Sequence, residues 1–288
     1  MKKIIVATAF ITTLDLGGVQ IAIGQEVPAQ GQDSMRLLEE VIVTARRQSE
    51  SMQDVPVAVT AFSSEALQRN QINNLQDLRG RVPSLTIGGS GQQRHSESPT
   101  IRGQGGTFGA SPGVVLYYAE VPLPADFPFN GQGGPGMFFD LIDLQVLKGP
   151  QGTLFGRNTT GGALLLQPAE PESEFGASLA AQGSSYSGQD YEGVLNVPIV
   201  DETLLMRASL KSTERDGFTE DFTSGNDLDN DDFWTARLGI TWTPTDKIEN
   251  YLQGYYTDSS NNGTASINCE MTSGGVTTAA SATIPTIT

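Results

Sequence analysis

The spacing of glycines between Gln145 and Gln167 constrains the fold of this chain more than any other stretch. A short apolar run at Val146 and Leu147 ends at Lys148-Gly149-Pro150, and a second apolar run occupies residues 163–166. Four glycines lie between these runs: Gly152, Gly156, Gly161 and Gly162. Glycine permits positive φ and close backbone approach, so the pattern predicts two strands joined by a tight hairpin or loop rather than by a helix. The alternative is a flexible linker, which the flanking apolar runs do not suit.

The balance of charge excludes one large class of partner. The 288 residues carry 33 acidic and 17 basic side chains, for a net charge of −16. Such a chain repels phosphate backbones, so we predict that it binds no nucleic acid. Because the chain has one cysteine, Cys269, and one histidine, His95, it has no internal disulfide framework and no Cys-rich or His-rich metal site. We expect neither a cofactor nor a bound metal.

One segment matches an enzyme motif, but its context is wrong. Residues 109–113 read G-A-S-P-G, the G-x-S-x-G string of serine hydrolases. In that family the histidine follows the nucleophile, whereas His95 precedes Ser111. Pro112 has no N–H to offer an oxyanion hole. We therefore predict no enzyme activity and no catalytic residue, and an esterase built on Ser111 is the enzymatic alternative.

Residues 55–170 alternate short strands with short helices. Residues 55–60, V-P-V-A-V-T, predict a strand. Ser63 is placed to cap a helix over residues 64–70, with Glu65 in its first turn. Asn73 or Asn74 caps a second helix that carries Leu75 and Leu78 on one face. Further strands are predicted at residues 85–87, 99–103 and 113–118.

Taken together, these segments resemble the plug domain of TonB-dependent outer-membrane receptors. The glycine stretch is similar to the closing segment of that domain, Val82-Pro83-Ser84 to its L-P-S-like turn, and Ile101-Arg102-Gly103 to its I-R-G element. The resemblance covers roughly residues 39–170 and implies an α+β plug domain at residues 55–170. Its structural motif residues would be Arg102, Gly103, Gly149, Pro150, Gly152, Gly156, Arg157, Gly161 and Gly162. The resemblance also suggests Arg102 and Arg157 as ion-pair partners between plug and barrel, and solvated surface arginines are the equal alternative.

The N-terminal region predicts export. Lys2 and Lys3 precede an apolar stretch at residues 4–14, which is too short to span a bilayer as a helix, so residues 1–24 are predicted to be a signal peptide. No other apolar segment approaches about 18 residues, so a membrane protein of this composition would have to be a β-barrel. The resemblance then implies the outer membrane of a Gram-negative cell.

A coupling segment is predicted within residues 25–54, after a disordered spacer. Its centre is β-branched and extended, which suits addition of a strand to the sheet edge of another protein. It resembles the TonB box, which implies contact with the periplasmic domain of TonB through Glu40, Val41, Ile42, Val43, Thr44 and Ala45. An ordinary first strand of the plug is the alternative.

After Glu170 the apolar pattern takes a period of two. In the clearest segment Trp234, Ala236, Leu238, Ile240 and Trp242 alternate with polar residues and glycine, as a strand between lipid and a wet lumen requires. Similar patterns start near residues 175, 191 and 204, and residues 247–257 form a fifth strand whose lipid face is ambiguous. We therefore predict antiparallel transmembrane β-barrel strands over residues 171–258. A soluble β-sandwich is the alternative.

Two further segments are predicted to lack strands. Residues 214–232 carry eight carboxylates and fit a solvated extracellular loop. Asp232 and Leu238 stand where an EF-hand needs glycine and glutamate, which excludes that calcium loop, whereas looser calcium binding is the less favoured alternative. Residues 259–288 are a low-complexity tail rich in Ser, Thr, Gly and Ala.

The resemblance implies a function in uptake without covalent chemistry. Receptors of this family close 22 strands around the plug, at about ten residues per strand, and five strands make an incomplete barrel. We therefore expect the N-terminal part of a truncated receptor that imports a scarce nutrient, such as an iron–siderophore complex. Its partners would be the TonB periplasmic domain, outer-membrane lipid and an extracellular small ligand. The alternatives are a secreted or surface-bound β-rich binding protein without transport activity, and a non-functional truncated remnant.

Overall fold

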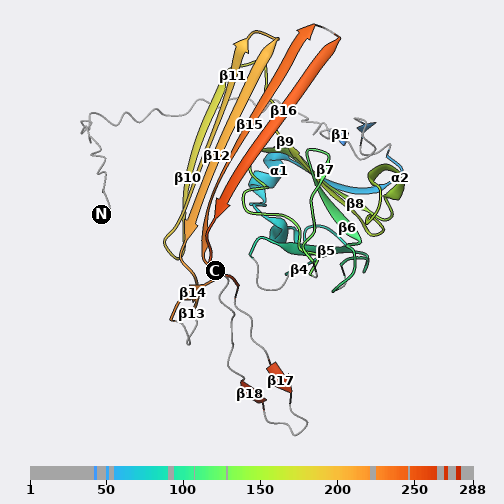
Figure 1. The fold of residues 1–288 in the computed structure, drawn as a ribbon, viewed down its shortest axis with the longest axis vertical. Helices are drawn as coiled ribbons and strands as arrows, with labels where there is room; N and C mark the ends of the chain where they lie inside the picture. The colour runs from blue at the N-terminus through green and yellow to red at the C-terminus, as the bar shows by residue number, and fades with distance from the viewer. Residues whose placement is uncertain are drawn as a thin grey trace, which may run out of the picture. The chain divides into compact units, whose positions relative to one another are not determined.

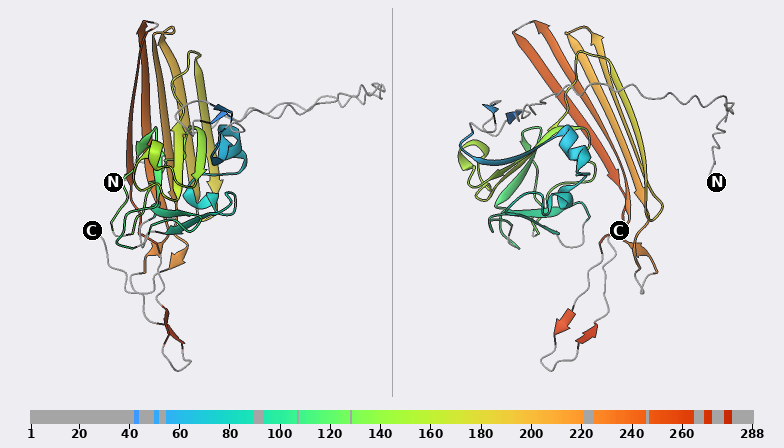
Figure 2. Two further views of the ribbon diagram at one scale, coloured as in Figure 1. Left: turned by 90° about the vertical axis from the view of Figure 1, so that its right-hand side faces the viewer. Right: turned by 180° about the vertical axis from the view of Figure 1, so that it is seen from behind.

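The computed structural model describes residues 42–43, 50–51, 55–89, 94–106, 108–127, 129–220, 225–245, 247–264, 269–271 and 277–279. Two five-stranded sheets dominate this part of the chain (Figures 1 and 2). We call the sheet from residues 58–168 the mixed sheet and the sheet from residues 176–259 the long-stranded sheet. None of the helices in these ranges is both long enough and apolar enough to cross a membrane.

The mixed sheet has the strand order β3-β8-β9-β6-β7. Its strands are β3 (Ala58–Ser63), β6 (Val114–Tyr118), β7 (Val121–Pro122), β8 (Leu141–Lys148) and β9 (Gly162–Pro168). All pairs are antiparallel except β6 and β9, which run parallel. The strand predicted at residues 55–60 begins instead at Ala58, beyond Pro56, which has no N–H to donate to a ladder.

The short helices start where capping residues predicted them. In α1 (Ser64–Arg69), the Ser63 hydroxyl accepts a hydrogen bond from the Ala66 N–H at 3.3 Å. The second helix is a single 3-10 turn, η1 (Leu75–Leu78), whose cap Asn74 exchanges hydrogen bonds with Asp77. The hairpin of β4 (Leu85–Gly89) and β5 (Glu97–Ile101) follows.

The glycine stretch forms the predicted hairpin, with one correction. Strands β8 and β9 pair antiparallel, but the connection contains a helical turn, α2 (Gly152–Phe155), where no helix was expected. The turn is stabilised because the ring of Phe155 is buried and the Tyr117 hydroxyl donates to the Phe155 carbonyl. Gly156, at φ 77°, ends the turn in a conformation that disfavours side chains.

The long-stranded sheet confirms the five predicted strands. They are β10 (Gly176–Ser184), β11 (Gly188–Val200), β12 (Leu204–Arg215), β15 (Asp231–Thr245) and β16 (Ile248–Ser259). They lie in chain order and every pair is antiparallel. The sheet is not closed, since β10 and β16 each have one strand neighbour among the described residues.

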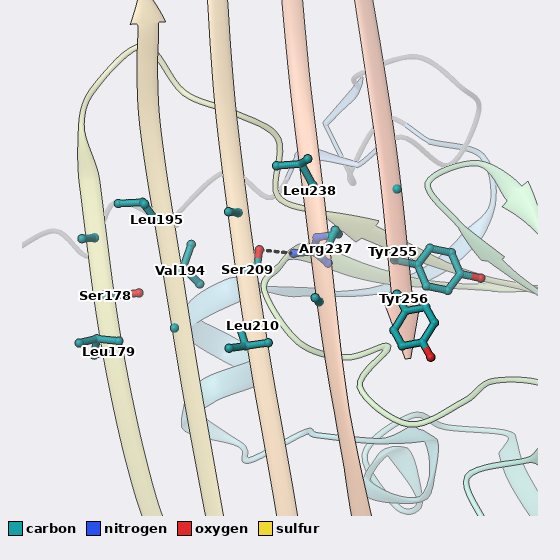
Figure 3. A pocket seen from close by; sticks show the side chains of 15 residues that line it. Ser178, Leu179, Val194, Leu195, Ser209, Leu210, Arg237, Leu238, Tyr255 and Tyr256 are labelled. Carbon is teal, nitrogen blue, oxygen red and sulfur yellow. Dashed lines mark hydrogen bonds between the residues drawn. The ribbon is translucent and has the colours of Figure 1, made fainter. Parts of the chain in front are cut away.

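The register gives the long-stranded sheet two distinct faces. Leu210 lies opposite Ala236, which lies opposite Tyr256, so these residues share the outer face with Leu179 and Leu238 (Figure 3). The outer face is exposed: Leu179 is 91 % accessible. The inner face alternates with it and buries polar residues, among them Arg237, Thr235 and Thr241. This register also resolves the ambiguous strand, since it places Leu252 and Tyr256 on the outer face of β16.

Three short ladders complete the described chain. Strands β13 (Thr219–Glu220) and β14 (Asp227–Leu228) pair within the acidic connection. Strand β1 (Ile42–Val43) pairs with β2 (Glu50–Ser51). Strands β17 (Cys269–Met271) and β18 (Thr277–Ala279) pair within the segment predicted to be a tail without strands, so that prediction is wrong there.

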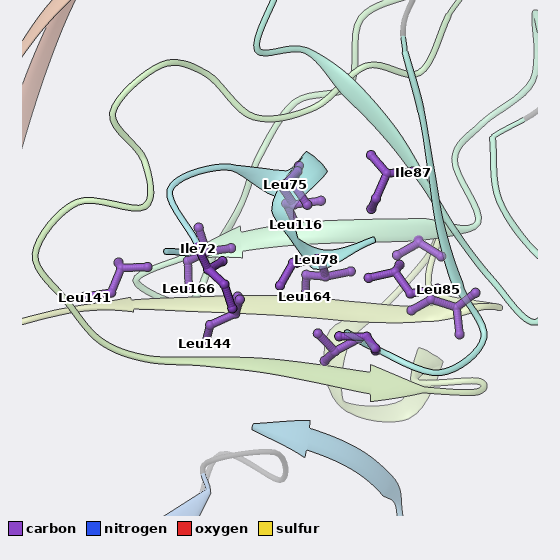
Figure 4. Close-up of a cluster of buried hydrophobic side chains, with 14 of the residues drawn as sticks. Ile72, Leu75, Leu78, Leu85, Ile87, Leu116, Leu141, Leu144, Leu164 and Leu166 are labelled. Atoms are coloured by element: carbon purple, nitrogen blue, oxygen red, sulfur yellow. The ribbon is translucent and has the colours of Figure 1, made fainter. Parts of the chain in front are cut away.

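The main core lies on one face of the mixed sheet. Leu116, Leu144 and Leu164 from the strands pack against Leu75 and Leu78 of η1 (Figure 4). A smaller cluster forms on the opposite face, where Val115, Leu147 and Ala163 pack with Phe155. Alternate residues of β6, β8 and β9 thus serve two cores, which is why these strands read as continuous apolar runs.

Candidate functional site

The mixed sheet contacts the inner face of the long-stranded sheet through a buried carboxylate, Asp140. Arg207 of β12 forms two hydrogen bonds with it, at 2.6 and 3.1 Å, and the Ser209 hydroxyl donates at 2.6 Å. Arg237 of β15 donates to the same carboxylate at 2.5 Å. The Asp140 and Arg237 side chains are only 7 % and 6 % exposed. Asp140 therefore links two long strands to the mixed sheet through a desolvated ion-pair network.

Arg237 also donates three hydrogen bonds to residues 118, 139 and 140, which lie in or beside the mixed sheet. It donates to the Tyr118 hydroxyl at 2.7 Å, to the Phe139 carbonyl at 3.1 Å and to the Asp140 carbonyl at 2.7 Å. Burial by itself would raise the pKa of Asp140, but hydrogen bonds from Arg207 and Ser209 and the charge of Arg237 outweigh it. The net pKa of Asp140 lies below its ordinary value of 3.8. The carboxylate is thus held in its charged form at neutral pH.

A glycine lets the two sheets approach closely beside this network. A Cβ added to Gly136 would lie 2.4 Å from the Thr235 side chain on β15, closer than real Cβ atoms come to a neighbour. Gly136 also has φ 76°, a conformation that strains other residues. The turn at residues 135–138 therefore requires glycine at this position.

A second ionic cluster, which we call the Arg94 cluster, joins the β4–β5 connection to the start of β15. Arg94 forms hydrogen bonds with both carboxylate oxygens of Asp231, at 2.8 and 2.9 Å, and with Asp229 at 3.2 Å. The His95 ring lies 2.8 Å from Asp231, and Arg215 donates to Asp231 at 2.6 Å. The acidic connection was predicted to be a solvated loop, and this is wrong for Asp229 and Asp231, because arginines balance their burial.

The comparisons with known proteins identify the mixed-sheet domain. A family model described as "TonB-dependent Receptor Plug Domain" matches residues 51–163. Residues 51–163 belong to the plug-domain family of TonB-dependent receptors. The plug is followed by antiparallel strands, as in the solved receptors that it resembles.

Relatives of this plug include transporters and receptors. The vitamin B12 transporter BtuB of Vibrio vulnificus (strain CMCP6) is 28% identical over 151 residues, which cover 50% of this chain and 23% of the relative. The pesticin receptor of Yersinia pestis is 25% identical over 217 residues, covering 74% of this chain and 30% of the relative. The chain therefore spans less than a third of the length of these relatives. One is a transporter and the other a receptor.

Solved structures show the same fold. The ferric yersiniabactin uptake receptor FyuA from Yersinia pestis superposes with a TM-score of 0.61 at 24% identity, over 70% of this chain and 31% of that one. The ferripyoverdine receptor of the outer membrane of Pseudomonas aeruginosa gives 0.60 at 14% identity, over 76% and 27% of the two chains. At these identities the likeness concerns the fold.

The predicted motif residues gather around the base of the β8–β9 hairpin. A Cβ on Gly162 would lie 2.1 Å from the Leu147 carbonyl, and one on Gly161 would lie 2.5 Å from the Gln104 carbonyl. The guanidinium of Arg102 lies over Gly149, at 3.2 Å from a Cβ placed there. Gly103, Gly149, Gly156 and Gly162 have positive φ, and Pro150, Gly152 and Gly156 border or form α2. These residues hold the hairpin closed against β6 and the β5 turn.

The predicted ion-pair roles remain predictions, and the structure uses other arginines. Arg102 and Arg157 are exposed and form no ion pair with the described residues of the long-stranded sheet. The contacts instead involve Arg94 of the plug and Arg207 and Arg237 of the sheet. Arg207 and Arg237 could have been recognised from the sequence, because they stand at inward-facing positions of the predicted strands. A solvated inner face does not by itself require a charged residue at those positions.

The predicted TonB contact lies mostly outside the described residues. Glu40, Val41, Thr44 and Ala45 fall there, whereas Ile42 and Val43 form β1 and pair with Ser51 and Glu50. The ladder joins two residue pairs and gives β1 a single strand neighbour among the described residues. The hydrolase-like segment offers no catalytic geometry: Ser111 is exposed, and the His95 ring is engaged by Asp231.

Proposed function

We propose that this chain forms the N-terminal part of an outer-membrane receptor that imports a scarce nutrient in a TonB-driven step. In this proposal, residues 1–24 direct export and the outer face of β10–β16 contacts outer-membrane lipid. The plug, residues 55–170, blocks the lumen until TonB draws on residues 40–45. We favour a ferric siderophore complex as the ligand class, because the similar solved structures include receptors for ferric yersiniabactin and ferripyoverdine.

The single observation that carries the proposal is the buried network around Asp140. A plug that only filled space would need apolar contacts, whereas this one is tied to two long strands by charges that cost free energy to desolvate. Such pairs are specific in geometry, and their charges can be rehydrated when the two parts separate. The arrangement suits a plug that stays seated and is released by a directed force.

The outer face of the long-stranded sheet disfavours the rival function of a secreted binding protein. Trp234 and Trp242 border an exposed apolar band that includes Leu179, Leu210 and Leu238. An unpartnered band of this size on a soluble protein would cause association, whereas lipid covers it in a membrane. The aromatic residues at its edges suit the two membrane interfaces.

The test is binding of the TonB periplasmic domain to the coupling segment. Val43→Pro removes one backbone donor and distorts its neighbours, and each main-chain hydrogen bond contributes roughly 0.5–1.5 kcal/mol, so we expect at least about tenfold weaker binding. Gln32→Pro, in the spacer, is the matched control and should bind like the parent chain. Equal affinity of both variants, measured by titration calorimetry, would refute the proposed coupling role.

A further inference from the structure

Two adjoining cavities lie between the plug and the inner face of β10–β12. The larger has a volume of about 680 Å³ and is lined by α1, by residues 169–172 and by inner-face residues such as Ser178 and Arg207. The smaller, of about 230 Å³, is lined by η1, by Ser184 and by residues of the Arg94 cluster. The two cavities share lining residues, among them Phe139, Gln182 and Asp190. They therefore follow one another along the same strands.

Phe139, Glu192 and Lys211 are among the residues that line both cavities. Lys211 of β12 forms an ion pair with Glu192 of β11 at 2.5 Å, and its ammonium lies 6.0 Å from the centre of the Phe139 ring. Phe139 is 5 % exposed and Lys211 is 8 % exposed. An ion pair beside an aromatic ring therefore borders both volumes.

The cations along this lining are already neutralised. Lys211 pairs with Glu192, Arg207 with Asp140, and Arg215 with Asp231. Three lining carboxylates form no ion pair with any described residue: Glu97, Asp190 and Glu170. Asp190 lines both cavities, faces Gln182 across the β10–β11 ladder and accepts a hydrogen bond from Thr213 at 2.7 Å. The lining thus carries an excess of negative charge, which repels anions.

We infer that the two cavities form one aqueous conduit along β10–β12 that admits neutral or cationic hydrophilic solutes and disfavours anions. The inference rests on the proposed function, since the conduit would be the side of the plug along which the nutrient passes. It assigns to that nutrient a polar surface without net negative charge. It also assigns the inner face of the first three long strands, together with the start of β15 at Asp231 and Phe233, as the wall of the passage.

Three serines on and beside β10 provide a matched test. Ser178 lines the larger cavity, Ser184 lines the smaller one, and Ser185 lies exposed in the following turn. In a Cys269→Ser background, each is changed separately to cysteine in the full chain, held in detergent micelles. The rates of modification by the cationic trimethylammonium-ethyl and by the anionic sulfonato-ethyl methanethiosulfonate are then measured at each cysteine. The ratio of the two rates cancels differences in exposure between the three sites.

We expect the ratio of cationic to anionic rates at Ser178→Cys and Ser184→Cys to exceed that at Ser185→Cys by roughly sixfold, the effect of one unit charge about 8 Å away in water. Adding Asp190→Asn should lower the ratio at Ser184→Cys towards the control. Equal or inverted ratios would overturn the inference, and so would failure of both inner cysteines to react while Ser185→Cys reacts. The modification assay does not require TonB, so the two proposals can fail separately. If TonB binds normally but the ratio of cationic to anionic rates is not raised at the inner cysteines, the conduit alone is refuted. If the ratio is raised but the Val43→Pro variant binds TonB as well as the control does, the uptake proposal alone is refuted.

Discussion

Replacing Asp140 with asparagine should loosen the plug from the long-stranded sheet. The change preserves shape and removes the charge that Arg207 and Arg237 share. Arg237 would then be a buried guanidinium without a counterion, since its other partners are the Tyr118 and Ser209 hydroxyls and two carbonyls. Breaking a buried ion pair by removing one partner costs about 3–5 kcal/mol.

The structure places the expected loss near the lower end of that range. Arg207 is 15 % exposed and retains Glu172 at 3.7 Å, so water and a second carboxylate relieve part of its cost. Arg237 retains neutral acceptors that orient it. We therefore expect a loss of about 3 kcal/mol, which at an m-value of about 2 kcal/mol/M lowers the urea midpoint by about 1.5 M.

The assay is pulse proteolysis of the full chain in detergent across a urea series, because both tryptophans lie in the long-stranded sheet and do not report on the plug. Asp201→Asn is the matched control, since Asp201 is exposed in a turn and forms no ion pair with described residues. The reasoning fails if both variants have the same midpoint. A double-mutant cycle with Arg237→Gln then measures the coupling between the two side chains.

The loss of stability caused by Asp140→Asn should be smaller at acidic pH than at neutral pH. Because the pKa of Asp140 is lowered by folding, its contribution to stability is complete above its ordinary value of 3.8 and is lost as the pH falls through the lower folded-state value. The difference between the parent chain and Asp140→Asn should therefore be constant near neutral pH and shrink only below 3.8. A difference that shrinks between pH 8 and pH 5 would point to another titrating group.

Three further changes test other parts of the structure. Gly162→Ala should destabilise the plug by at least about 2 kcal/mol and lower the urea midpoint, because its Cβ would lie 2.1 Å from the Leu147 carbonyl. The control Gly152→Ala should leave the urea midpoint nearly unchanged, because its Cβ would meet no atom within 4 Å. Leu238→Arg should reduce insertion into lipid vesicles at a cost of about 2–4 kcal/mol, and normal insertion would argue against a lipid-facing outer surface. Gln132→Ala should cost about 2 kcal/mol, since its side chain bonds the Leu116 N–H and the Val114 carbonyl, and full retention of slow amide exchange in β6 would contradict this.

Local signals in the sequence were sufficient for most elements. The caps at Ser63 and Asn74 are read from neighbouring residues, and the alternation in β15 separates an exposed apolar face from a buried polar one. The helical turn α2 was missed because its stability comes from Tyr117, far away in the sequence. The ambiguous face of β16 needed the register with β15.

The ionic contacts between plug and sheet could not be predicted in the same way. Asp140 and Arg237 are separated by 97 residues, and no local pattern states which carboxylate meets which guanidinium. Asp229 and Asp231 stood within a run of acids that suggested solvent, and only the fold brings Arg94 to them. The glycine motif could be recognised because its glycines shape the backbone within one short segment. The ion pairs join residues that are far apart in the sequence, so no single segment reveals them.

The position of β9 within the mixed sheet has a consequence for how the plug is made. The last plug strand lies between β8 and β6, so without it the sheet separates into two pairs, β3 with β8 and β6 with β7. The pairing of β9 with β6 joins Val114 to Gly162, and it forms slowly because the long loop between them must be closed first. The emerging chain therefore has no complete plug core until Pro168 has been synthesised, and until then β8 and β6 each keep an unpaired edge.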